Sequence, residues 1–140
     1  MPRIAALLAV ALTAMLAAAA CAAEDVYECP AGSELNVEYR LFMGRNSGGV
    51  EVVSDQDWAV FLQDIVTPRF PNGLTVLDGE GQWQIESGDI ERERSKVLVI
   101  LSPQGGGAQA HLAEVATSYK QLFNQGAVIQ TSAGVCTSFY

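Results

Sequence analysis

Few residues of this chain could carry out chemistry. Its 140 residues include one histidine, His111, and three cysteines, Cys21, Cys29 and Cys136. One histidine without a Cys-x-x-Cys pair supplies no zinc ligand set, and a catalytic histidine normally needs a partner that orients it. We therefore expect no metal and no cofactor, and we expect His111 to be a surface or interface residue.

A glycine-rich stretch, FPNGLTVLDGEGQWQ (70–84), has two interpretations. A catalytic loop would need a nucleophile, a base or a ligand pair, and this stretch offers only Asp78 and Glu80. The outward arm of a β-hairpin fits it throughout, because isolated glycines in a strand pattern mark a bulge or a bend. The structural interpretation is favoured, with Trp83 either packed in the core or lining a pocket.

The first 22 residues are typical of a secretory signal peptide. Arg3 precedes an apolar stretch at 4–20, and small residues follow that stretch. Two alternatives stay open at its end: Cys21 is lipidated as in a lipoprotein, or cleavage falls at a nearby Ala-x-Ala site. We expect an exported protein that is periplasmic, anchored by lipid to the outer membrane, or secreted.

Charge and length limit the partners and the domain count. The net charge is −8, which argues against nucleic acid and anionic lipid as partners, so a membrane would be reached only through a lipid at Cys21. Residues 23–36 form an acidic leader broken by Pro30 and Gly32. Residues 37–140 have the length of one domain.

Hydrophobic periodicity predicts the elements of that domain. Alternation predicts strands at 37–44, 75–86, 90–102 and 127–139, and helical spacing predicts a helix capped by Ser54 and another over 108–124. The order βαββαβ is that of a ferredoxin-like sandwich, an α+β fold in which one antiparallel sheet carries two helices on one face.

This topology places the first and last strands side by side. Their antiparallel pairing brings the segments that carry Cys29 and Cys136 together, and an oxidising compartment permits a disulfide between them. Two buried free thiols are the alternative.

Several segments together resemble one known family. They are YRLFMGR (39–45), the run from VSDQDW to DGEGQWQ (53–84), RSKVLVIL (94–101) and SYKQLFNQGAVIQ (118–130). The chain is similar in these segments to a bacterial family of small exported proteins, domain-of-unknown-function family 3574. The resemblance implies export, and it implies no reaction, cofactor or catalytic residue.

The strand KVLVIL (96–101) is apolar on both faces, whereas the helices cover only one face of the sheet. We assign Leu98 and Ile100 to the uncovered face, beside Phe42 of the first strand. An exposed apolar patch usually marks an interaction site, so we expect a homodimer through this sheet face. The alternative is that the leader segment folds back and covers this face of the sheet.

Two functions are considered. The main hypothesis is a non-enzymatic envelope module for binding or assembly, because polar groups are too sparse for the usual catalytic constellation. The alternative is a cofactor-free enzyme of the dimeric α+β barrel type, with Tyr39, Arg40, Trp83 and His111 as the candidate catalytic residues. A pocket holding at least two of these four side chains would favour the enzyme.

Overall fold

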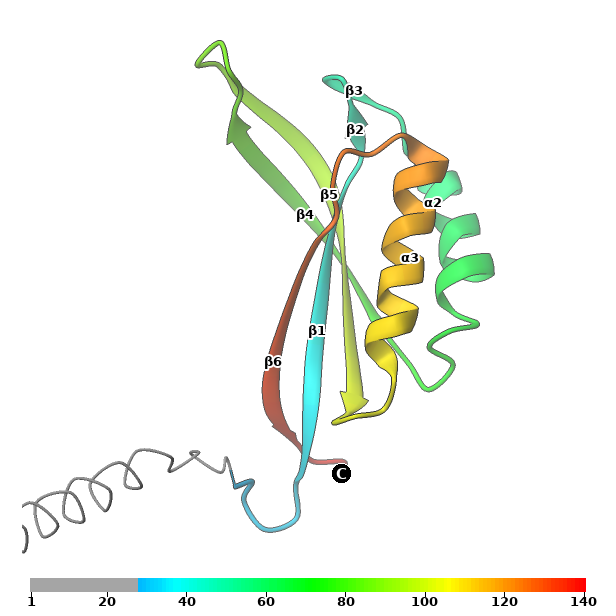
Figure 1. Ribbon diagram of the computed structural model, residues 1–140, viewed down its shortest axis with the longest axis vertical. Helices are drawn as coiled ribbons and strands as arrows, with labels where there is room; N and C mark the ends of the chain where they lie inside the picture. Colours follow the sequence, from blue (N-terminus) through cyan, green and yellow to red (C-terminus); the bar gives the residue numbers. More distant parts are fainter. Residues whose placement is uncertain (1–27) are drawn as a thin grey trace, which may run out of the picture.

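The computed structural model describes residues 28–140, in which one four-stranded antiparallel sheet carries two helices (Figure 1). The predicted signal peptide, Cys21 and the first residues of the leader lie outside the described residues. Within 28–140, none of the helices has both the length and the apolar character needed to span a membrane.

The sheet has the strand order β4-β5-β1-β6, and neighbouring strands are antiparallel. Its strands are β1 (Glu34–Gly44), β4 (Thr75–Gln84), β5 (Ile90–Pro103) and β6 (Ile129–Thr137). A separate two-stranded ribbon, β2 (Asn46–Ser47) with β3 (Val50–Glu51), follows β1 in a segment outside the predicted strands. The last residues of the predicted leader belong to β1, because Glu34 and Leu35 already pair with β6.

The first helix, α2 (Asp55–Phe61), begins as the sequence predicts. The Ser54 hydroxyl accepts a hydrogen bond from the Asp57 N–H at 3.1 Å, and the Asp57 carboxylate accepts one from the Ser54 N–H at 3.0 Å. This reciprocal capping box satisfies backbone donors that the first helical turn leaves free. The helix continues as a π-helical turn, η2 (Leu62–Val66), and stops before Pro68.

The second helix, α3 (Ala108–Phe123), ends at Asn124, which adopts a left-handed conformation with φ of 51°. Asparagine tolerates this conformation better than most residues. The helix therefore ends at the boundary that the sequence predicts, 108–124, to within one residue.

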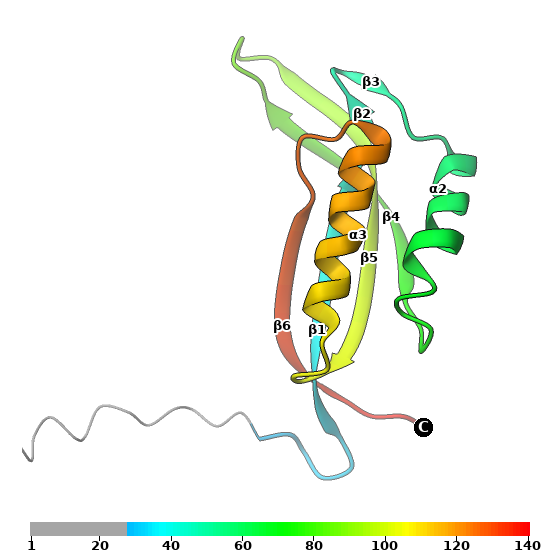
Figure 2. The same ribbon diagram turned by 45° about the vertical axis from the view of Figure 1, so that its right-hand side comes forward.

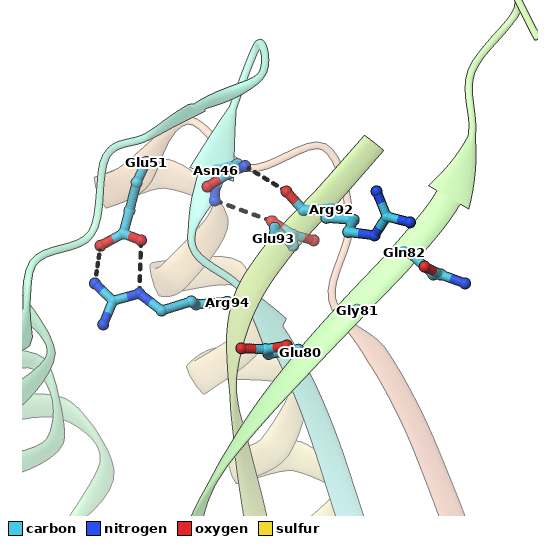
Figure 3. Close-up of a pocket in the computed structure, with 8 residues that line it drawn as sticks. All are labelled: Asn46, Glu51, Glu80, Gly81, Gln82, Arg92, Glu93 and Arg94. Atoms are coloured by element: carbon cyan, nitrogen blue, oxygen red, sulfur yellow. Dashed lines mark hydrogen bonds and ion pairs between the residues drawn. The ribbon is translucent and has the colours of Figure 1, made fainter. Parts of the chain in front are cut away.

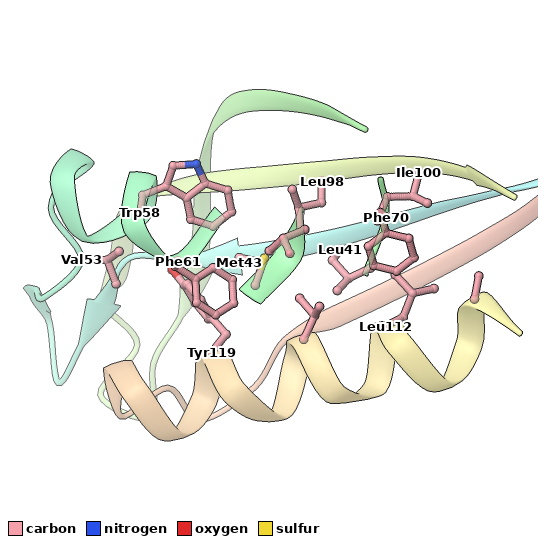
Figure 4. Packing of buried hydrophobic residues seen from close by; sticks show 13 residues of the cluster. Leu41, Met43, Val53, Trp58, Phe61, Phe70, Leu98, Ile100, Leu112 and Tyr119 are labelled. Atoms are coloured by element: carbon pink, nitrogen blue, oxygen red, sulfur yellow. The ribbon is translucent and has the colours of Figure 1, made fainter. Parts of the chain in front are cut away.

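Both helices cover the same face of the sheet (Figure 2). The core lies between them and the two central strands (Figure 4). Its members include Leu41 and Met43 from β1, Leu98 and Ile100 from β5, Trp58 and Phe61 from α2, and Leu112, Val115 and Tyr119 from α3.

The assignment of the uncovered face was wrong for two of its three residues. Leu98 and Ile100 are fully buried beneath the helices, whereas Phe42 lies on the opposite face and is 37% exposed. The pairing register gives the reason: Leu98 is the direct partner of Leu41, and Phe42 is the partner of Val97. Direct partners share a face of the sheet, so the odd-numbered residues of β5 face away from the helices.

The uncovered face nevertheless carries an apolar row that crosses all four strands. The row consists of the direct partners Leu77, Val97, Phe42 and Ile129. Leu77 and Ile129 are largely exposed, and so is Leu101 farther along β5. The predicted homodimer through this face therefore loses two of the three residues named for it, because Leu98 and Ile100 belong to the core.

The sulfur atoms of Cys29 and Cys136 lie at disulfide distance, 2.13 Å, as the topology suggested. Cys136 pairs with Leu35 near the start of β1. The bond therefore joins the N-terminal segment to the last strand, and such a pair is compatible with an exported protein.

Candidate functional site

The candidate site lies where the β4–β5 hairpin extends past the end of β1. Gly44, the last residue of β1, is paired with Ser95, but β5 continues back to Ile90. Beyond Gly44 the β2–β3 ribbon lies beside β5 instead. The Arg45 N–H donates to the Arg94 carbonyl at 3.1 Å, and the Asn46 side chain donates to the Arg92 carbonyl at 3.4 Å.

One hollow at this end, of about 580 Å³, is polar, and we call it the polar hollow (Figure 3). Its principal contact joins Arg94 to Glu51 through both carboxylate oxygens, with Nε donating at 2.9 Å. This contact lowers the pKa of Glu51 and raises the pKa of Arg94. The pair attaches β3 to β5. The hollow is lined by Asn46, Glu51, Glu80, Gly81, Gln82, Arg92, Glu93 and Arg94.

A buried arginine lies close to this pair. Arg45 is almost completely buried, its Nε donates to the Val53 carbonyl at 2.7 Å, and its Nη1 donates to Asp55 at 2.8 Å. Its Nη2 lies 3.1 Å from Glu51, an ion-pair contact without hydrogen-bond geometry. The guanidinium lowers the pKa of Asp55. Because a buried charge is tolerated only when it is paired, we interpret this cluster as structural.

A second hollow of about 580 Å³ lies on the uncovered face, and we call it the aromatic hollow. Trp83 and Phe42 supply its rings, and the loop between α3 and β6 forms one rim. All of its lining belongs to residues 28–140, and this lining holds three glutamates but no lysine, arginine or histidine: the glutamates are Glu80, Glu91 and Glu93. Acidic and aromatic groups in one hollow favour a positively charged ligand.

Among these carboxylates, Glu93 has its position fixed by two contacts. It accepts a hydrogen bond from the Asn46 N–H at 3.0 Å and lies against Gly44, where any Cβ would collide with its carboxylate. On the helix side, the Tyr119 hydroxyl donates to the Gly44 carbonyl at 2.8 Å. Gly44 is thus contacted on both faces, and its missing side chain leaves the space that Glu93 occupies.

The glycines of the hairpin have a related role. A Cβ at Gly79 would lie 3.0 Å from the Ser95 hydroxyl. The pairing register runs unbroken through Gly79 and Gly81, from Thr75 with Val99 to Gln84 with Ile90. The stretch is therefore a continuous hairpin arm, and its glycines permit close approach without inserting a bulge.

The four candidate catalytic residues are not brought together. Trp83 lines the aromatic hollow, whereas His111 lines a different hollow. There the rings of His111 and Phe70 meet edge-on, with their centroids 6.1 Å apart. Tyr39 packs against the core, and Arg40 is paired with Glu38 at 2.7 Å on the uncovered face. Within residues 28–140, no three His, Cys, Asp or Glu side chains are placed to hold a metal ion.

Sequence reasoning missed Glu93 and Gly44 as a pair. Glu93 lies within the strand predicted at 90–102, and Gly44 is the last residue of the strand predicted at 37–44. The two residues are far apart along the chain, and only the register of β1 against β5 reveals that they meet.

A family profile described as "Protein of unknown function (DUF3574)" matches residues 38–139. The chain belongs to this family. The family resemblance seen in the sequence is confirmed, and the match extends over nearly all of the described chain. A comparison with curated proteins gives no match.

Two solved structures have a similar fold. One is a phage SAM lyase in complex with S-methyl-5'-thioadenosine, with a TM-score of 0.55 and 16% identity over 81% of this chain and 95% of that chain. The other is a phage SAM lyase in the apo state, with a TM-score of 0.54 and 16% identity over 83% of this chain and 99% of that chain. At such identity the likeness concerns the fold alone.

This likeness corrects the functional prediction. A non-enzymatic binding or assembly module was favoured because polar groups are sparse, but a similar fold serves an enzyme. The prediction of a non-enzymatic module is therefore not upheld, because the fold is compatible with catalysis.

Proposed function

We propose that the protein is a cofactor-free enzyme that binds a small organic cation in the aromatic hollow. One observation carries the proposal. The Glu93 carboxylate, held by the Asn46 N–H against Gly44, lines a hollow that contains Trp83 and Phe42 and whose lining in residues 28–140 has no basic side chain.

Each of these groups suits a cation for a physical reason. An aromatic ring attracts a cation through the negative face of its π-system. A carboxylate that is fixed in advance and partly shielded from water attracts a positive charge more strongly than one in bulk solvent. Glu93 and Glu91 are both half-buried. The ring of Trp83 and these carboxylates would therefore act on the same charged group.

The same groups could support catalysis without a cofactor. A carboxylate can take a proton from the carbon adjacent to the one that bears a cationic atom. The electrons of the C–H bond then form a C=C bond between these two carbons, the bond from the second carbon to the cationic atom breaks, and that atom leaves with the bond's electrons as a neutral group. A sulfonium would leave as a thioether in such a step. Glu93 is the candidate base.

S-adenosylmethionine is the first substrate to test, because it is a sulfonium and because a lyase acting on it has a similar fold. Quaternary ammonium compounds belong in the same panel. We also infer that the protein is exported, which the disulfide pair and the signal-like N-terminus support. A ferredoxin-like assignment of the fold is supported by the strand order and by both helices lying on one face.

Calorimetry and product analysis test the proposal. S-adenosylmethionine and choline are titrated into the disulfide-intact protein, with S-adenosylhomocysteine as the neutral thioether control. We expect the cations to bind and the neutral control to bind at least about tenfold more weakly, which is 1.4 kcal/mol. Chromatography with mass detection then follows the conversion of each cation.

Glu93→Gln is the decisive variant, because an amide oxygen can still accept from the Asn46 N–H while the charge is lost. Glu86→Gln, on the exposed hairpin turn, is its matched control. We expect the first variant to lose cation binding and conversion, and the second to retain both. Equal binding of cations and the neutral control, or unchanged behaviour of Glu93→Gln, contradicts the cation site. Binding of cations without conversion of any of them contradicts the enzyme.

A further inference from the structure

The two edge strands of the sheet differ in how they are protected. The β4 edge carries the carboxylates Asp78 and Glu80 and two glycines. The β6 edge has the sequence IQTSAGVCT, with no charged residue and no proline, and its first six residues are exposed. Natural proteins usually guard an edge strand with charge, proline, a bulge or a covering segment. The β6 edge has none of the first three.

Among the described residues, the segment that carries Cys29 reaches β6 at its C-terminal end, where Cys29 is bonded to Cys136. The first six residues of β6 stay exposed. In both ribbon views β6 borders the sheet, and the C-terminal tail turns away from it at the far end (Figures 1 and 2). Within residues 28–140, β6 pairs with β1 and with no other strand. Its contact with α3 is a hydrogen bond from the Gln130 side chain to the Gln109 side chain, 3.0 Å long, on the helix side.

We propose that β6 pairs antiparallel with β6 of a second copy of this chain, so that two four-stranded sheets join into one of eight strands. Two-fold pairing of one strand with itself places every residue opposite another residue of the same strand. Around Ala133, at the middle of β6, Thr131 lies opposite Val135, and Ile129 lies opposite Thr137. No pair contains a charge.

Charge also favours a second copy at this place. The chain has a net charge of −8, so two copies repel each other wherever acidic surfaces meet. An uncharged strand edge lets them approach without bringing like charges together, and main-chain hydrogen bonds then stabilise the pair. The β4 edge, with Asp78 and Glu80, would place carboxylates opposite carboxylates in the same arrangement.

The proposed pairing of the two β6 strands also lies next to the aromatic hollow. Ile129 is the first residue of β6 and lines that hollow. Antiparallel pairing around Ala133 brings the C-terminal end of β6 from the second copy alongside this rim. The proposed interface and the proposed site are therefore neighbours, although neither proposal depends on the other.

Sedimentation of the disulfide-intact protein tests the interface across the micromolar concentration range. The test variant, Thr131→Lys with Ala133→Lys, puts two lysines on the β6 edge. The control variant, Thr75→Lys with Leu77→Lys, puts two lysines on the β4 edge. All four positions are exposed and lie on the uncovered face. We expect a dimeric wild type, a monomeric β6 variant and a dimeric β4 variant.

Two outcomes overturn the proposal. One is a wild type that stays monomeric at high micromolar concentration. The other is a dimer that the β4 variant disrupts and the β6 variant leaves intact, which would identify the apolar row containing Leu77 as the interface.

Amide hydrogen exchange provides a readout that needs no variant. Exchange over 129–135 should slow as wild-type concentration rises, whereas exchange over 75–84 should not change. Exchange in β6 that does not depend on concentration, in a protein that sediments as a dimer, also rejects the proposal.

Discussion

The two faces of β5 differ little in composition and greatly in environment. Leu98 and Ile100 point toward the helices and are fully buried, while Val97 and Val99 point the other way and are half-buried. On the covered face, apolar side chains form the core. On the uncovered face, Phe42 of β1 and Ile129 of β6 line a hollow with three carboxylates. Burial by the helices, rather than hydrophobicity, decides which residues stabilise the fold and which remain available to a ligand.

The largest effect should come from truncating the covered face. Leu98→Ala removes a fully buried side chain from the core and should lower the free energy of unfolding by about 2–5 kcal/mol. Leu101→Ala makes the same chemical change on the uncovered face, where the side chain is 48% exposed, and should cost below about 1 kcal/mol. Urea unfolding measures both values. Equal losses would mean that the uncovered face is buried in solution by something else.

The disulfide should have the next largest effect. It closes the sheet at the end opposite the candidate site and spans a sequence separation of 107 residues. Replacing Cys29 and Cys136 by serine should lower the free energy of unfolding by about 2–5 kcal/mol, while the cation binding proposed for the hollow should persist in the folded variant. Both cysteines should resist alkylation until a reductant is added. Ready alkylation of the oxidised protein would refute the bond.

The hydrogen bond from the Tyr119 hydroxyl to the Gly44 carbonyl connects the helix side of the sheet to the uncovered face, and removing it tests this connection. Burial raises the pKa of Tyr119, so the hydroxyl stays protonated and donates to the Gly44 carbonyl. Tyr119→Phe should lower the free energy of unfolding by about 1 kcal/mol, and it should also weaken ligand binding, because the backbone at Gly44 borders the space that Glu93 occupies. Tyr140→Phe, in the exposed tail, is the control. A loss of stability with unchanged ligand binding would show that the Tyr119 contact does not influence the site on the uncovered face.

The smallest effect should be the pH dependence of the ion pairs on the covered side. Contact with Arg94 lowers the pKa of Glu51, and contact with Arg45 lowers the pKa of Asp55. A carboxyl whose pKa is lowered by folding stabilises the protein fully above its ordinary pKa, which is 4.5 for Glu51 and 3.8 for Asp55. This stabilisation is lost as the pH falls through the lowered values of the folded state.

Thermal unfolding between neutral pH and pH 3 follows this loss. The double variant Glu51→Gln, Asp55→Asn should show a weaker dependence on acid than the wild type. Identical acid dependence of the two proteins would show that these pairs do not contribute.

Much of the fold could be predicted from local patterns. The capping box at Ser54 needs only residues three apart, and the hairpin arm through Gly79 and Gly81 needs only alternation and turns. The pairing of Cys29 with Cys136 followed once the element order placed the first and last strands together. Each of these features depends on short-range sequence or on topology alone.

Which face of β5 meets the helices depends on the pairing register of the strands, and the sequence pattern does not reveal that register. Both faces of β5 are apolar, so no pattern in that strand tells which of them meets the helices. The pairing of Leu41 with Leu98 decides it. The candidate site depends on the same register, because it brings Glu93 to Gly44. Of the four predicted catalytic residues, only Trp83 lines the aromatic hollow, since the other three were chosen by residue type and not by position.

The bond between Cys29 and Cys136 determines how the protein responds to mechanical tension. Glu34 and Thr137 are direct partners at one end of the β1–β6 pair. Without the bond, a pull on the two chain ends would load that pair from this end and open its hydrogen bonds one after another. With the bond in place, the pull passes from Cys29 directly to Cys136, and the chain between them bears no tension. The sheet, both helices and both hollows are then mechanically shielded, whatever holds the two ends of the chain.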